Sequence, residues 1–263
     1  MKIACIGTGS MGGAIMRAVC KKFNPEEIFV SNKTASKGEA FAKECGCHFV
    51  ADNKECIKNA KYIFIAVKPA ALNILFAEIS SSIPKDAVVV SMAAGVKIEK
   101  LNLFAPNARF VRIMPNVPAQ IGQAMTALCC NEDISGDELN EIKDILSACG
   151  KVEQVPEKLM DCVTAVSGSG PAFVFMFIEA MADAAVRCGM PRAQAYTYAA
   201  QTVYGSAGMV LQTGKHPAAL KDSVTSPGGT TIEGVAALEQ NGFRNSIIQA
   251  VTAACEKSIS MGK

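Results

Sequence analysis

Three glycines near the N-terminus have the spacing of a dinucleotide-binding turn. Gly7, Gly9 and Gly12 follow the apolar run at residues 2–6 as G-x-G-x-x-G. The first glycine permits a tight turn, the second lets the backbone approach a pyrophosphate, and the third allows close packing of helix on strand. The following helix offers free N–H groups and partial positive charge. A strand before and a helix after favour a ligand site over a merely tight turn. The predicted contacts are Ile6, Gly7, Thr8, Gly9, Ser10, Met11 and Gly12.

The residues about twenty positions beyond this turn bear on the choice of cofactor. An NAD site usually places Asp or Glu there to bind the ribose 2′-hydroxyl. This chain has Ser31, Asn32, Lys33 and Thr34 instead. No acid is present here to repel a 2′-phosphate, and Lys33 and the hydroxyls could bind one, so NADPH is favoured over NADH. The predicted cofactor contacts in this segment are Asn32, Lys33 and Thr34. The alternative is that Lys33 is only a solvated lysine.

Further cofactor contacts are expected after the later strand-like runs, because ligands of open parallel sheets lie beyond the carboxyl ends of the strands. Asn53 follows the third run and is expected on the adenosine side. The small residues at 93–95 would let a nicotinamide ring lie against the backbone. The predicted contacts in these later segments are Asn53, Ala66, Val67, Lys68, Pro69, Ala93, Ala94 and Gly95.

A second turn rich in glycine and hydroxyl groups lies at residues 225–231, TSPGGTT. Pro227 and the two glycines after it predict a turn, and Thr230 is expected to begin a helix. N–H groups at such a helix start favour a carboxylate or another anion. Thr230 and Glu233 also have capping-box spacing, so the alternative is that this threonine only caps the helix.

Alternating strands and helices must position the first turn. Apolar strand-like runs occur at residues 2–6, 27–31, 47–50, 62–67, 87–95 and 109–115. Helical stretches between them imply right-handed crossovers and a mainly parallel sheet. Two further runs, at 125–130 and 150–155, flank a helix over 137–148 and are expected to extend the sheet with an antiparallel edge. The pattern predicts an α/β, Rossmann-like dinucleotide-binding domain over residues 1–156.

After Pro156 the chain has the pattern of an all-α domain, residues 157–263. Helices are predicted over 170–189, 190–214 and 244–260, separated by Gly and Pro and apolar on more than one face. Such helices would expose apolar surface in a monomer, so we expect a homodimer or a larger homo-oligomer built on this region. The uncharged stretch 162–178 is short for a membrane span, and we interpret it as a buried interface helix.

Composition narrows the function classes. The 263 residues carry a formal net charge of +2, and 50% are hydrophobic. A near-neutral chain without a Lys/Arg-rich run favours neither nucleic acid nor an anionic membrane as partner. The eleven cysteines and the two histidines, His48 and His216, form no zinc-binding spacing, so no metal is predicted. Small buried thiols in a reducing cytoplasm are expected, and the first strand leaves no room for a signal peptide.

Six segments in order resemble one enzyme family. They are IGTGSMGGAI, AVKP, SMAAGV, RIMPNVPA, SGSGPA and LKDSVTSPGGTTIEGVAALE, and the chain is similar over nearly its whole length to pyrroline-5-carboxylate reductase. The last segment is the most specific of the six. The resemblance implies NAD(P)H-dependent reduction of Δ1-pyrroline-5-carboxylate to L-proline, the final step of proline biosynthesis.

The resemblance also implies a role for the second turn. Thr231 matches the threonine whose hydroxyl faces the ring nitrogen, where it can both donate and accept a hydrogen bond. Reducing a cyclic C=N bond needs a hydride, a proton and a hold on one carboxylate, and no metal or covalent nucleophile. Ser223 is a further candidate, although it could only cap the helix over 216–222. The predicted substrate contacts are Gly228, Gly229, Thr230, Thr231 and Ser223, with Thr231 as the catalytic residue.

Two other functions stay open at this point. A β-hydroxyacid dehydrogenase shares the two-part plan and uses a lysine from its helical domain. The helix over 171–188 contains no lysine, although Lys158 and Lys221 are available. A non-catalytic NADP-binding protein could keep the fold without the chemistry.

Overall fold

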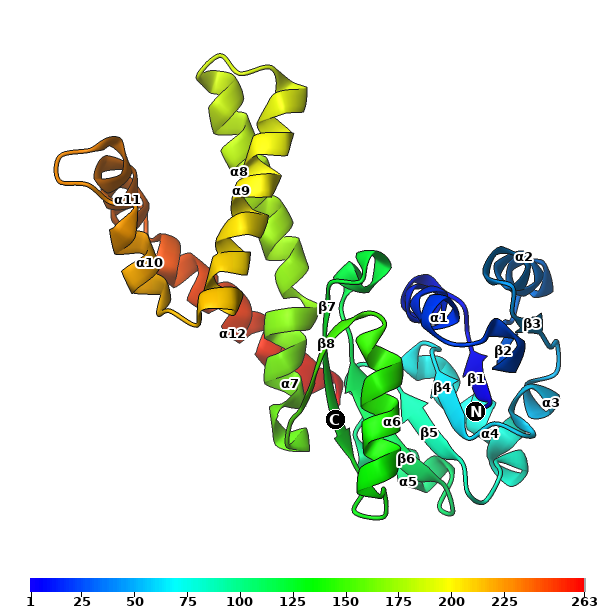
Figure 1. Ribbon diagram of the computed structural model, residues 1–263. Coiled ribbons are helices and arrows are strands. Elements are labelled where there is room, and N and C mark those ends of the chain that lie inside the picture. Colours follow the sequence, from blue (N-terminus) through cyan, green and yellow to red (C-terminus); the bar gives the residue numbers. More distant parts are fainter. Residues whose placement is uncertain (263) are drawn as a thin grey trace. The chain divides into compact units, whose positions relative to one another are not determined.

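The computed structural model describes residues 1–262 and divides into two compact units. The first comprises Met1–Ser169 together with the residues from Ala254 onward, and the second is Gly170–Ala253. The sequence places a domain boundary after residue 156, where the strand pattern ends, and that boundary stays a prediction. Residues from both ends of the chain thus belong to the first unit (Figure 1).

An eight-stranded sheet forms the centre of the first unit, in the order β3-β2-β1-β4-β5-β6-β7-β8. All neighbours from β3 to β6 are parallel, β7 is antiparallel to β6, and β8 is parallel to β7. The parallel sheet and its antiparallel edge confirm the predicted fold class. The strands are β1 (Ile3–Ile6), β2 (Ile28–Ser31), β3 (His48–Phe49), β4 (Tyr62–Ile65), β5 (Val88–Ser91), β6 (Arg109–Met114), β7 (Ala124–Cys130) and β8 (Gly150–Gln154).

Helices cover both faces of this sheet (Figure 1). They are α1 (Ser10–Lys22), α2 (Ala35–Cys45), α3 (Asn53–Ile57), α4 (Leu72–Ile79), α5 (Ile98–Phe104), α6 (Gly136–Ser147) and α7 (Met160–Val163). Short 3₁₀ turns are η1 (Pro25–Glu27), η2 (Pro69–Ala71), η3 (Ser80–Ser82), η4 (Val117–Ile121) and η5 (Glu157–Leu159), and η6 (Thr164–Gly168) is a π-turn.

Side-chain alternation along the strands divides the core into two layers. Ile3 and Cys5 of β1 pack on the face covered by α1, α2 and α6, whereas Ala4 and Ile6 pack on the opposite face. Both layers are closed by fully buried side chains such as Ile15 of α1 and Phe76 of α4. Burying one such side chain contributes roughly 1.5–3 kcal/mol. The first unit therefore supplies its own core and holds the loops at its sheet edge on rigid supports.

Local signals set several helix ends. Ser135 and Glu138 form a capping box at the start of α6, with Ser135 N–H donating to Glu138 Oε2 over 3.0 Å. α2 ends at Gly46 with φ 72°, a conformation that glycine adopts at little cost. Gly214, predicted to end the second long helix, is the C-cap of α9 (Arg192–Thr213) with φ 64°.

The second unit is helical. α8 (Gly170–Arg187) and α9 lie side by side, and α10 (Pro217–Ser223), α11 (Thr230–Gln240) and α12 (Phe243–Met261) follow (Figure 1). The last turns of α12 belong to the first unit. Among the described residues after Pro156 the predicted pattern of helices without strands is confirmed.

The described part of the second unit buries very little of itself. Its fully buried hydrophobic residues are three alanines, Ala182, Ala195 and Ala199. Large apolar side chains are exposed, including Phe175 at 58% and Met176 at 68% of their surface. By length and composition alone, the helical stretch Glu157–Arg187 could also cross a membrane, with mean hydropathy 1.4. Large apolar side chains exposed along one helix in this way indicate a surface that another molecule covers.

Candidate functional site

The first glycine turn is built against the end of β4. Gly7 has φ +100°, and a Cβ there would lie 2.6 Å from the carbonyl oxygen of Ala66. A Cβ at Gly12 would collide with the Gly7 carbonyl oxygen and with the Ala66 side chain. A Cβ at Gly9 would meet no atom within 4 Å. Two glycines therefore serve packing, and the third leaves open space in front of the helix start.

The start of α1 fits a bound pyrophosphate. Gly9 is the N-cap, no side chain caps the helix, and the first turn contains no acidic residue. The first-turn N–H groups are thus free of side-chain acceptors. Thr8 Oγ1 is buried and has no hydrogen-bond partner among the described residues. Unused donors, an orphaned hydroxyl and open space beside Gly9 are the features that a phosphate group would satisfy.

Two hydrogen bonds tie the turn to the end of β2. Gly7 N–H donates to the Ser31 carbonyl oxygen over 2.8 Å, and Thr8 N–H donates to Asn32 Oδ1 over 3.2 Å. The Asn32 amide also donates to the Thr34 carbonyl oxygen over 3.0 Å. Asn32 therefore positions the turn, which the sequence pattern did not reveal. Lys33 and Thr34 are exposed beside it.

Asn53 lies at the start of α3 and links three elements. Ser31 Oγ donates to Asn53 Oδ1 over 2.7 Å, and Asn53 Nδ2 donates to Glu78 Oε2 over 3.2 Å. Asp52 caps α3 by accepting from two N–H groups of its first turn. Sequence reasoning missed Glu78 because it lies at the end of α4, 25 residues beyond its partner.

The segments after β4 and β5 adjoin the turn, because β1, β4 and β5 are neighbours in the sheet. Ala66 N–H donates to the Ile6 carbonyl oxygen over 2.9 Å, while Lys68 is exposed. Ala93 and Gly95 are buried, and Gly95 packs on Met261 and Gly262 at the end of α12. Of the three residues predicted to lie against a nicotinamide, Ala94 is the one with partial exposure. The local pattern gave no sign of the α12 contact.

The second turn leads into a helix start without a side-chain cap. Gly228 has φ +65°, and Gly229 N–H donates to the Ser226 carbonyl oxygen over 3.1 Å. Gly229 is the N-cap of α11 and Thr230 is its first residue. The capping box considered for Thr230 and Glu233 is wrong, because the glycine occupies the cap and Glu233 makes no such bond.

The hydroxyls around this turn are used differently. Ser223 Oγ donates to the Leu220 carbonyl oxygen over 2.7 Å, and Thr225 Oγ1 donates to that of Lys221 over 2.7 Å. The hydrogen bond of Ser223 within its own helix thus supports the capping alternative for this residue. Thr230 and Thr231 are exposed at the start of α11, and their role in substrate binding stays a prediction.

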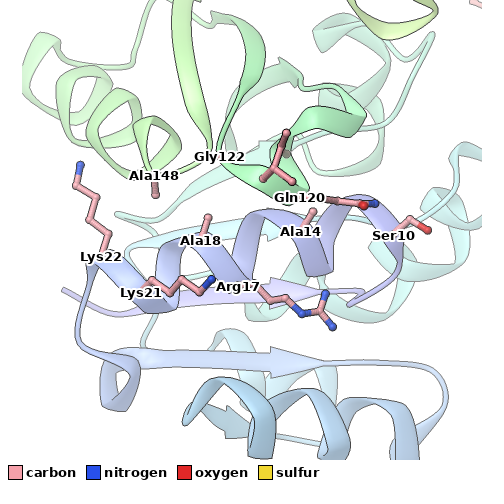
Figure 2. Close-up of a pocket in the computed structure, with 11 residues that line it drawn as sticks. Ser10, Ala14, Arg17, Ala18, Lys21, Lys22, Gln120, Gly122 and Ala148 are labelled. Carbon is pink, nitrogen blue, oxygen red and sulfur yellow. The ribbon is translucent and has the colours of Figure 1, made fainter. Parts of the chain in front are cut away.

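A hollow of about 830 Å³ runs along α1 (Figure 2). Ser10 and Gln120 line one end, and Lys22 lies near the other. Arg17 pairs with Glu44 over 2.6 Å and Lys22 with Asp144 over 2.5 Å, so carboxylates already neutralise two of its cations. Ser10 is the residue that this hollow shares with the predicted pyrophosphate contacts. The hollow therefore lies beside the candidate site and does not coincide with it.

The cysteines are unpaired and most are shielded. Burial raises the pKa of Cys149 to about 11 and that of Cys129 to about 12, so these thiols stay protonated near neutral pH. The expectation that the thiols are buried is wrong for Cys162 and Cys188, which are exposed. In residues 1–262, no three His, Cys, Asp or Glu side chains are grouped to hold a metal ion.

Two family models match separate parts of the chain. The model described as pyrroline-5-carboxylate reductase dimerisation matches residues 157–261. The model described as NADP oxidoreductase, coenzyme F420-dependent, matches residues 2–95.

Full-length relatives share both parts. The chain is 44% identical to pyrroline-5-carboxylate reductase of Escherichia coli, covering 100% of this chain and 98% of that protein. A solved pyrroline-5-carboxylate reductase of Coxiella burnetii is 34% identical with a TM-score of 0.92, over 100% and 98% of the two chains. The pyrroline carboxylate reductase of Plasmodium falciparum, solved with NADP bound, is 31% identical with a TM-score of 0.90 over the same shares.

Proposed function

The chain belongs to the pyrroline-5-carboxylate reductase family, and we propose that it reduces Δ1-pyrroline-5-carboxylate to L-proline. The observation that carries this function is the end-to-end match at 44% identity, which includes both glycine-rich turns. The protein is thus an oxidoreductase of the final step of proline biosynthesis. A bound nicotinamide cofactor supplies the hydride.

The cofactor belongs to the first unit. The NADP-oxidoreductase match over residues 2–95 and the packing of the first turn support a dinucleotide on the α1 start. We propose that NADPH is preferred to NADH because Lys33 is exposed at the end of β2, where a 2′-phosphate would gain a cation.

Lys33→Ala tests this preference. The variant should lose affinity for NADPH several-fold while its affinity for NADH stays within about twofold, since a single exposed ion pair contributes up to ~1 kcal/mol. Michaelis constants for both nucleotides give the ratio, and an unchanged ratio would remove Lys33 from the proposal.

The substrate belongs to the start of α11. The uncapped N–H groups of its first turn offer donors for the substrate carboxylate, and the helix dipole favours that charge. Thr231 is exposed next to them, and its hydroxyl can accept from a protonated imine and donate to the amine product. We assign Thr231 the role of orienting the ring nitrogen, with Gly228, Gly229 and Thr230 forming the carboxylate site. Such positioning contributes several kcal/mol in favourable cases.

The assembly is proposed to be a homodimer or a larger homo-oligomer through α8 to α12. The exposed apolar side chains of α8 and the dimerisation-model match over 157–261 support this interface. Covering the same side chains explains the apolar stretch Glu157–Arg187 without a membrane. Light scattering should give at least a dimer at micromolar concentration, and a stable monomer would contradict the proposal. The unpaired cysteines suit a cytoplasmic location.

The reaction is tested directly by mixing the purified protein with NADPH and pyrroline-5-carboxylate. Loss of NADPH absorbance should match the proline formed. A β-hydroxyacid with NADP⁺ serves as the control, and NADP⁺ should not be reduced in this mixture. Turnover of the hydroxyacid alone would favour the dehydrogenase alternative, and nucleotide binding without turnover would favour a non-catalytic protein.

A further inference from the structure

A carboxylate stands next to the predicted adenosine end of the cofactor site, although the expected NAD-type acid is missing from β2. Glu78 Oε2 accepts a hydrogen bond from Asn53 Nδ2 over 3.2 Å, and Asn53 Oδ1 accepts from Ser31 Oγ over 2.7 Å. One amide group therefore separates the Glu78 carboxylate from Ser31. Ser31 immediately precedes the segment 32–34, where the 2′-phosphate is proposed to bind.

The chemistry of the three groups fixes their orientation. An ionised carboxylate only accepts hydrogen bonds, so Asn53 must turn its Nδ2 toward Glu78 and its Oδ1 toward Ser31. Ser31 is 1% exposed, and its hydroxyl could accept equally well from a flipped amide. Glu78 is therefore the member that decides the orientation, and the same bond directs its exposed side chain toward Asn53.

The charge of Glu78 acts unequally on the two nicotinamide cofactors. A 2′-phosphate carries up to two negative charges, whereas the 2′-hydroxyl of NADH carries none. A fixed carboxylate nearby repels the first and leaves the second unaffected. Lys33 and Glu78 would thus act in opposite directions on the same discrimination.

We propose that Glu78 is a specificity-determining residue that weakens the preference for NADPH over NADH, held in place by its hydrogen bond to Asn53. The inference rests on the proposed dinucleotide site of the first unit.

Equilibrium binding tests the inference without turnover. Tryptophan fluorescence cannot be used as the binding signal, because the chain has no tryptophan. Binding is followed instead by the fluorescence of the reduced nicotinamide. Dissociation constants for NADPH and NADH are measured for the wild type, Glu78→Gln and Glu78→Lys at low salt. The dissociation constant for NADH divided by that for NADPH should rise about threefold in Glu78→Gln, which removes the charge, and about tenfold in Glu78→Lys, which reverses it.

Two controls separate charge from structure. Glu99→Gln removes the same charge from an exposed glutamate of α5 and should leave the ratio unchanged. At about 1 M salt, where the screening length falls to ~3 Å, the Glu78 variants should approach the wild-type ratio. A circular-dichroism melt checks that each variant is folded.

The outcomes are distinct. A ratio that is unchanged in both Glu78 variants, that shifts equally in Glu99→Gln, or that shifts identically at high salt overturns the inference. A wild-type protein that binds neither nucleotide overturns the proposed cofactor site itself.

Discussion

The two glycine-rich turns have the same local design and very different support. Each ends in a glycine N-cap, Gly9 before α1 and Gly229 before α11, and neither helix start has a side-chain cap. The first turn is supported by neighbouring elements of the same unit: its glycines pack against the end of β4, and two hydrogen bonds join it to the end of β2. Around the second, α11 has no buried residue at all.

This difference shows that a binding motif and a finished binding site are separate properties. The first turn is preformed by one chain, since its neighbours along the sheet are already in place. The second turn has the N–H donors, but its own unit packs few side chains around them, since the core of that unit consists of three buried alanines. Nucleotide binding should therefore survive changes that abolish turnover, whereas the reverse should not occur.

The largest expected effect comes from overfilling the first turn. Gly12→Val would drive a side chain into the Gly7 carbonyl oxygen and Ala66. Affinity for NADPH should fall by at least about 100-fold, equal to ~2.7 kcal/mol, as measured by nucleotide fluorescence. Gly9→Ala is the matched control, because its Cβ meets no protein atom: it should fold normally and lose less affinity. Equal binding by Gly12→Val and wild type would mean that the turn is not preformed.

A charge on the exposed face of α8 should abolish turnover and spare nucleotide binding. Phe175 is 58% exposed, and Phe175→Glu would place a carboxylate in the proposed interface. Turnover should fall by more than about 30-fold, the effect of losing a residue worth ~2 kcal/mol to an interface. NADPH affinity should stay within about threefold of wild type. Light scattering should show smaller particles. An intact assembly with full turnover would contradict the proposal that turnover depends on this face of α8.

Removing one hydroxyl from the second turn should have a smaller, purely catalytic effect. Thr231→Ala should lower kcat about tenfold, the value of one neutral hydrogen bond of ~1.4 kcal/mol, without shifting the melting temperature. Thr231→Ser keeps the hydroxyl and should recover most of the rate. Activity of Thr231→Ala within about twofold of wild type would show that Thr231 takes no part in the reaction.

The smallest effect concerns the stability of the first unit. A hydrogen bond from Lys61, with a second from the Tyr62 hydroxyl, lowers the pKa of Glu141 on α6. A carboxyl whose pKa is lowered by folding stabilises the fold above its unfolded pKa of about 4.3, and that contribution is lost as pH falls through the folded value. Glu141→Gln should therefore cost up to ~1 kcal/mol of unfolding free energy at pH 7, since the pair is partly exposed. Denaturant titrations at pH 7 and below pH 4 should show this gap narrowing in acid. A constant gap would rule out charge as its origin.

Much of the fold and part of the candidate site could be read from sequence, because their signals are local. Strand alternation and glycine spacing predicted the parallel sheet, and Gly214 marked a helix end. The contacts that could not be predicted join distant positions. Each of these contacts depends on how the sheet orders its strands or on where α12 ends. They are the contacts of Asn32 with Thr8, of Asn53 with Glu78 and of Gly95 with Met261.

The capping alternative at the second turn fails for a different, local reason. Thr230 and Glu233 have the correct spacing for a capping box, but the turn through Gly228 and Gly229 begins the helix one residue earlier. Sequence spacing gives the residues that could cap a helix, whereas the backbone conformation of the preceding turn decides which residue does.

The return of α12 to the first unit has a consequence for how the protein is made. Ser258 donates to Asp161 over 2.6 Å, and Met261 packs on Gly95, so late residues complete a unit that begins at Met1. A ribosome synthesises Met1–Ser169 first, then all of Gly170–Ala253, and only afterwards the residues from Ala254 onward. The sheet can form while the chain is still growing. The loop at Gly95 gains its final covering only after the whole helical unit has left the ribosome.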